Sequence, residues 1–136
     1  MQFYATTDFL TIGFHSPTWT ATTGYSLEYE LYRWNIGYEE TFEQEPVATG
    51  FFENWQDGVC VPLEANQGAG EYLLVARYSS AEDQHNGGVW YEDVEREDQR
   101  AYLDGAIWYD CAIRATIVYA NKPKVAYGPL SDSGLE

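Results

Sequence analysis

A strict alternation of apolar and polar side chains between Tyr25 and Arg33 places the strongest constraint on the fold. Every second residue in this segment is large and apolar: Tyr25, Leu27, Tyr29 and Leu31. Side chains of a β-strand point alternately to its two faces. The period therefore predicts a strand over 25–33, with this set of residues facing a core and the residues between them facing water.

Short runs rich in Val, Ile, Thr and aromatic residues recur along the chain and are separated by Gly, Pro, Asn and Asp. They predict further strands over 9–15, 46–53, 59–63, 71–78, 88–91 and 109–119. The run Tyr72-Leu73-Leu74-Val75-Ala76 is apolar throughout, as in a central strand that is buried on both faces. Phe51 and Tyr72 join Tyr25 and Tyr29 as rings expected to face inward. The prediction is an all-β fold, a two-sheet antiparallel β-sandwich of jelly-roll-like topology.

The 136 residues suffice for one domain, which we place at 1–120. The acidic segment 92–104 is expected to be a solvated excursion, and Asp104-Gly105 is a hairpin-turn signal. Residues 121–136 are expected to be a linker and tail, and Leu135-Glu136 is typical of a cloning remnant. The chain has no signal peptide pattern and no apolar run of 18 residues that would predict a membrane span.

The charge balance excludes several classes of partner. Seven Lys and Arg stand against 22 Asp and Glu, which gives a formal net charge of −15. This charge repels phosphate backbones and anionic lipid, so neither nucleic acid nor membrane is expected as a partner. Acidic polysaccharides would be repelled as well, whereas neutral sugars tolerate an acidic protein.

Signatures of catalysis are sparse, and we expect no enzyme activity. The two histidines, His15 and His85, have no zinc-ligand spacing, and no nucleophile elbow, phosphate loop or dinucleotide fingerprint occurs. The many carboxylates fall mainly in predicted loops and on water-facing strand positions. Cys60 and Cys111 are expected to be small buried hydrophobes, although a bridge between them stays open.

No cofactor is predicted outright, and the identity of any metal stays unknown. A structural calcium ion remains an open alternative, because calcium is held by carboxylates and backbone carbonyls in loops. The residues that could supply such ligands are Asp57-Gly58, Asp83, Asp93, Asp104-Gly105 and Asp110. They form no Asp-x-Asp-x-Asp-Gly loop, so their pattern is not specific for calcium.

Aromatic residues are the distinctive feature of the chain, with 5 Trp, 12 Tyr and 6 Phe. Most must belong to the core, but some fall outside the predicted inward positions. An exposed flat ring can stack on the apolar face of a sugar. The candidate glycan-binding residues are Trp19, Trp108, Tyr109, Tyr32 and Trp34. The alternative for each ring is a packing role beneath a loop.

An ordered series of short motifs supports a family resemblance over about residues 3 to 120. The motifs are Leu31-Tyr32-Arg33-Trp34-Asn35, Tyr38-Glu39-Glu40-Thr41, Glu45-Pro46-Val47, Phe52-Glu53-Asn54-Trp55-Gln56-Asp57, Gly70-Glu71-Tyr72-Leu73-Leu74-Val75, Gly88-Val89-Trp90-Tyr91 and Ala101-Tyr102-Leu103-Asp104-Gly105. The series resembles carbohydrate-binding-like β-sandwich modules that lie beside catalytic domains in extracellular glycan-degrading bacterial enzymes. The resemblance implies that Tyr32, Trp34, Trp55 and Trp90 are framework residues, which leaves Trp19 and Trp108 as the better candidates for individual function.

The leading hypothesis is a non-catalytic module, extracellular or at the cell surface and covalently linked to further domains. It would keep an attached glycoside hydrolase on neutral plant or host polysaccharide by stacking through exposed aromatic residues. The alternative is a structural spacer or protein-interaction module of a multidomain extracellular protein, with no glycan site. An enzyme would require two carboxylates facing each other across a cleft.

Overall fold

The structure, a computed structural model, describes residues 1–15, 25–55, 60–79, 91–92, 98–103, 105–109, 112–113, 115–120 and 130–135. Its elements in chain order are β1 (Gln2–Ala5), β2 (Phe9–His15), β3 (Tyr25–Arg33), α1 (Tyr38–Phe42), β4 (Ala48–Trp55), β5 (Cys60–Gln67), β6 (Gly70–Ser79), β7 (Tyr91–Glu92), β8 (Gln99–Arg100), β9 (Tyr102–Leu103), β10 (Ala106–Ile107), β11 (Ala112–Ile113) and β12 (Ala115–Tyr119). The predicted bounds of β2 and β3 are confirmed. Within the described ranges, no helix has the length and apolar character that a membrane crossing requires.

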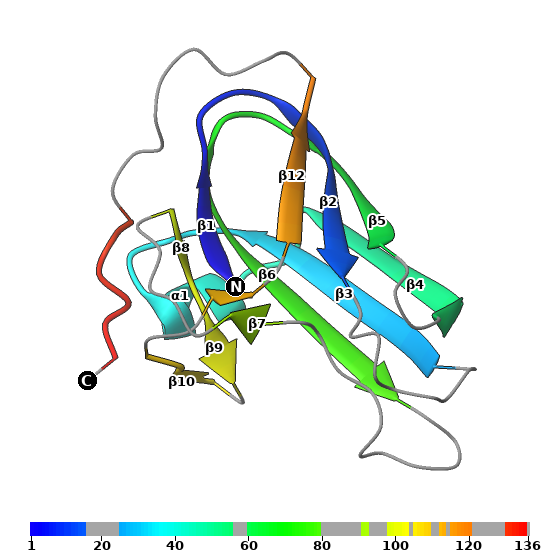
Figure 1. Cartoon of the computed structure of the whole chain (residues 1–136). Coiled ribbons are helices and arrows are strands. Elements are labelled where there is room, and N and C mark those ends of the chain that lie inside the picture. Colours follow the sequence, from blue (N-terminus) through cyan, green and yellow to red (C-terminus); the bar gives the residue numbers. More distant parts are fainter. Residues whose placement is uncertain are drawn as a thin grey trace.

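Two antiparallel sheets form the body of the molecule (Figure 1). The larger sheet has the strand order β4-β3-β6-β1-β8, and the smaller one has the order β12-β2-β5. The predicted all-β, two-sheet sandwich is therefore confirmed, whereas its jelly-roll topology stays a prediction. Two short ladders, β10-β9 and β11-β7, complete the strand pairing of the described residues.

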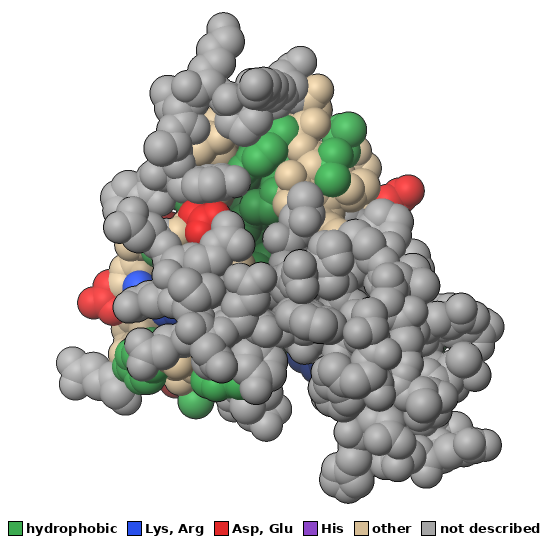
Figure 2. Space-filling view, in the orientation of Figure 1, with side chains coloured by type: hydrophobic (Ala, Val, Ile, Leu, Met, Phe, Trp, Pro, Cys, Tyr) green, Lys and Arg blue, Asp and Glu red, His purple; other side chains and the backbone are tan. Residues whose placement is uncertain are grey.

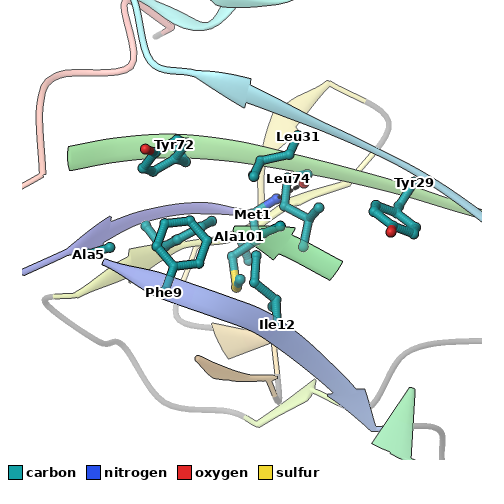
Figure 3. Packing of buried hydrophobic residues seen from close by; sticks show 11 residues of the cluster. Met1, Ala5, Phe9, Ile12, Tyr29, Leu31, Tyr72, Leu74 and Ala101 are labelled. Carbon is teal, nitrogen blue, oxygen red and sulfur yellow. Dashed lines mark hydrogen bonds between the residues drawn. The ribbon is translucent and has the colours of Figure 1, made fainter. Parts of the chain in front are cut away.

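The core lies between the two sheets. In Figure 3, side chains of β3 and β6, among them Leu31 and Tyr72, point toward Phe9 and Ile12 of β2. The rings of Phe9 and Tyr72 meet edge to face, with centroids 5.1 Å apart. Such a pair contributes about 0.5–1.5 kcal/mol beyond the area that it buries. Close aromatic packing at this point therefore joins the smaller sheet to the larger one.

Strand β6 is central and is buried on both faces, as the apolar run predicted. Tyr72 and Leu74 belong to the core cluster between the sheets, whereas Leu73, which is equally buried, points to the opposite face. The cross-strand partner of Leu73 is Tyr32, whose ring stacks on Phe42 of α1 at a centroid distance of 5.4 Å. Helix α1 therefore covers part of the outer face of the larger sheet.

Phe51 was expected to face inward, and this expectation is wrong, because 58% of the residue is exposed. Strand β4 aligns Gly50 with Tyr29 and Ala48 with Leu31, so its even-numbered residues face the core here. Phe51 is paired with Glu28 and shares the outer face with it. The Phe51-Phe52 doublet leaves the strand's phase ambiguous in the sequence, and pairing with β3 decides it.

One further expectation needs correction. The acidic segment 92–104 is not wholly a solvated excursion, because β8 pairs with β1 inside the larger sheet and Gln99 is buried. The linker role of residues 121–136 stays a prediction. Within the described part of this segment, Ser131 forms hydrogen bonds with Glu71 on the outer face of that sheet, and the Ser133 carbonyl accepts from the Tyr38 N–H of α1. The Asp104-Gly105 turn signal is confirmed, since β9 and β10 pair around Gly105, whose φ is +84°.

Candidate functional site

Trp108 and Tyr109 directly follow the β9–β10 hairpin. Trp108 is directed to the core, and Tyr109 is directed to solvent. Trp108 packs against the core cluster, and its backbone N–H donates to the carbonyl oxygen of Ala101 at 2.9 Å. Tyr109 lies on the surface with 68% of the residue exposed. Because Trp108 fixes the backbone, Tyr109 is presented from an ordered position.

Tyr32 and Trp34 take part in packing. Only 4% of Tyr32 is exposed, its ring lies against Phe42, and its hydroxyl donates to Glu30 Oε2 at 3.0 Å. Burial, followed by the Glu30 carboxylate, raises the pKa of Tyr32 to about 12. Trp34 is half-buried, and its indole Nε1 is buried without a hydrogen-bond partner in the structure. Both residues are less exposed to solvent than Tyr109.

The remaining predicted residues fall outside the described residues. This holds for Trp19, Trp90, His85, Cys111, the side chains of Trp55, His15 and Cys60, and the aspartates considered as calcium ligands, namely Asp57, Asp83, Asp93, Asp104 and Asp110. Among the side chains that the structure does describe, no three His, Cys, Asp or Glu residues gather as a potential metal site.

Exposed apolar side chains also occur at positions that the sequence did not single out. Figure 2 shows hydrophobic side chains over the strands of the smaller sheet, where Leu10 of β2 and Val118 of β12 are exposed. Ile36 is 79% exposed, and its φ of +65° is rare for a β-branched residue. The Asn35-Ile36-Gly37 sequence offered a signal, because Asn and Gly flank tight turns.

Backbone and hydroxyl hydrogen bonds stabilise the turn at Ile36. The Gly37 N–H donates to the Asn35 carbonyl oxygen at 2.7 Å, which closes a γ-turn of the strained, positive-φ kind. The buried Thr41 hydroxyl accepts from the Asn35 N–H at 2.8 Å and donates to the Gly37 carbonyl at 2.7 Å. Thr41 therefore ties both sides of the turn to α1.

A cation–aromatic contact involves Arg33, the last residue of β3, and therefore lies at the same end of this strand as the turn at Ile36. The Arg33 guanidinium carbon is 5.2 Å from the centroid of the Tyr72 ring, and Arg33 Nη2 donates to the Tyr72 hydroxyl at 3.1 Å. That hydroxyl donates in turn to the Gly68 carbonyl at 2.6 Å. Burial raises the pKa of Tyr72, so the phenol remains a hydrogen-bond donor through the neutral range.

Comparisons with protein-family models, with curated proteins and with solved structures gave no match to this chain. Among the described glycan-binding candidates, Tyr109 is the one whose side chain is largely exposed, beside the core-packed Trp108.

Proposed function

We propose that the chain is a non-catalytic carbohydrate-binding module for neutral plant or host polysaccharide. Tyr109 is the observation that carries the proposal: its ring is open to solvent on a backbone that Trp108 holds against the core. A ring fixed in this way loses little conformational entropy when it stacks on a sugar. The net charge of −15 favours neutral over acidic glycans.

The proposed setting follows from the motif series described above. The module would be extracellular, jelly-roll-like in topology, and linked to a glycoside hydrolase that it keeps near its substrate. One stacking ring contributes on the order of 1 kcal/mol, so we expect micromolar to millimolar affinity and dependence on repeated sites along a polymer.

Affinity electrophoresis through gels that contain neutral plant polysaccharides or mucin tests the proposal. The unmodified chain should be retarded in at least one gel, and Tyr109→Ala should reduce the affinity about fivefold to tenfold. Phe51→Ala is the matched control, because Phe51 is a similarly exposed ring and lies on β4, whereas Tyr109 lies in a turn after β10. It should leave retardation unchanged. No retardation across a broad panel would overturn the proposal.

A structural spacer or protein-interaction module is the second candidate. Tyr32 and Trp108 favour it, because both rings are used in packing. The same gels separate the two candidates, since a spacer should migrate identically with and without glycan.

A further inference from the structure

Residues 131–134 lie against the outer face of the larger sheet, in a segment that runs beside α1 and β8 (Figure 1). The Ser131 N–H donates to Glu71 Oε2 at 2.9 Å. The Ser131 carbonyl accepts from Gln2 Nε2 at 3.1 Å and from Arg100 Nη1 at 3.0 Å. The Ser133 carbonyl accepts from the Tyr38 N–H at 2.9 Å. We call Gln2, Tyr38, Glu71 and Arg100 the cradle.

The cradle also restricts which side chains the bound segment can carry at positions 131 and 133. The Ser131 hydroxyl donates to Glu71 Oε1 at 2.6 Å, so Glu71 accepts both hydrogens that Ser131 offers. Ser133 is buried, which leaves little room for a larger residue. A Cβ on Gly37 would lie 3.1 Å from the Ser133 carbonyl oxygen, so the glycine permits this close approach. The site therefore fits a Ser-x-Ser-Gly segment bound mainly through its main chain.

The hydrogen bonds of the buried Gln2 amide indicate that the cradle needs a bound segment to supply one of its partners. Gln2 is 0% exposed, and its amide nitrogen donates to Glu71 and to the Ser131 carbonyl. Its amide oxygen accepts from Arg100 and Tyr102. All four hydrogen-bonding positions of the amide are therefore used, and one depends on the segment. A buried polar group that loses its partner costs about 1–3 kcal/mol.

We propose that the cradle also binds residues 131–134 of a second copy of this chain, so that two copies exchange their C-terminal segments. The contacts join groups of the segment to groups of β1, β6, β8 and α1, and none depends on which copy supplies the segment. Exchange of an identical element between protomers recreates every contact, which makes it a low-cost route to a dimer.

Concentration determines which form is populated. A segment tethered to its own domain acts at an effective concentration in the millimolar range. Closure within one copy therefore predominates in dilute solution. Exchange becomes visible at lower concentration when one copy has only an intact cradle and the other has only an intact segment.

Two full-length variants create this situation. Glu71→Lys removes both acceptors for Ser131 and adds a positive charge near Arg100, which leaves the segment intact. Ser131→Pro removes the donating N–H and the hydroxyl, which leaves the cradle intact. Ser131→Pro is labelled with nitrogen-15, and unlabelled Glu71→Lys is added up to about 1 mM. The Tyr38 amide resonance is the reporter, because its N–H donates to the Ser133 carbonyl.

We expect the Tyr38 amide of the labelled chain to return toward its position in the unmodified protein, with a dissociation constant of about 1 mM or tighter. A chain carrying both substitutions is the matched control and should produce no shift. The amides of Tyr29 and Leu31, which lie in the core strand β3, report whether each variant remains folded. If Ser131→Pro unfolds the chain, Ser131→Ala replaces it. Absence of any Tyr38 shift between folded partners would overturn the proposal.

Discussion

The Tyr29 ring lies over the α-carbon of Gly50, its cross-strand neighbour, so closely that a Cβ at position 50 would overlap the ring. Tyr29 belongs to the core, and its hydroxyl donates to the Glu64 carbonyl at 3.3 Å. The absence of a side chain at Gly50 thus provides space for the ring between β3 and β4.

Gly50→Ala should therefore destabilise the protein, by about 1–3 kcal/mol, because the added methyl group must displace the Tyr29 ring or the backbone. Urea unfolding measures the effect. Gly68→Ala is the matched control, since its Cβ would make only an ordinary 3.6 Å contact with Asp8 Oδ1. Equal stability of the two variants would contradict this account of Gly50.

Ile36→Asn should stabilise the protein by about 1 kcal/mol, because a positive φ is unfavourable for a β-branched residue and is several-fold more common for Asn. Ile36 is largely exposed, so the substitution removes little packing. Thermal unfolding provides the measurement. Asn66→Gly is the control: Asn66 has a φ of +53°, but its residue type already suits that conformation. A lower melting temperature for Ile36→Asn would show that the Ile36 side chain has a packing role.

Stability should rise between pH 5 and pH 8. The amino group of Met1 donates to the Leu74 carbonyl at 2.6 Å, and burial lowers the pKa of this group from 8.0 to about 5. In this range the unfolded chain binds the proton and the folded chain does not, so protonation at low pH favours unfolding. The full difference is up to about 4 kcal/mol.

Urea titrations at several pH values measure this slope. An ordinary histidine side chain also titrates in this range, so the variant with both His15→Gln and His85→Gln is the control and should keep the slope. A slope that disappears in that variant would assign the effect to histidine instead of Met1.

Tyr32→Phe should lower stability at neutral pH by about 0.5–1.5 kcal/mol, because the hydrogen bond to Glu30 is lost. Between pH 10 and pH 12 the unfolded chain releases the Tyr32 proton while the folded chain retains it, since the pKa is raised to about 12. The unmodified protein therefore loses stability across that range. The variant should lose less, and urea titrations at pH 8, 10 and 11 would show this. If the free energy of unfolding falls equally with pH in the two proteins, the raised pKa of Tyr32 is not the cause of the loss.

The sequence predicted the parts of the fold that depend on local periodicity. Strands β2 and β3 were located correctly because their apolar residues recur at every second position. The phase of β4 was not predicted, because it depends on the contact between Tyr29 and Gly50 across two strands. Helix α1 has five residues and no repeating apolar face, so its sequence carries little helical signal.

The same distinction applies to the candidate sites. Tyr109 was singled out because an aromatic residue after a hairpin turn is visible in the sequence, and its glycan-stacking role stays a prediction. The cradle was not, because Gln2, Glu71 and Ser131 are far apart along the chain and become partners only after the sheet has formed. Tyr32 was placed correctly on the face opposite Tyr29, but the covering of that face by α1 could not be predicted.

The hydrogen bond between Gln2 and Ser131 brings the beginning and the end of the described chain to one place. A short peptide linker could therefore join these two ends, and new termini could be introduced at another surface turn. The Met1 nitrogen, once part of a peptide bond, would still offer an N–H to the Leu74 carbonyl. The sandwich is thus a natural candidate for circular permutation and for insertion into a loop of a host protein.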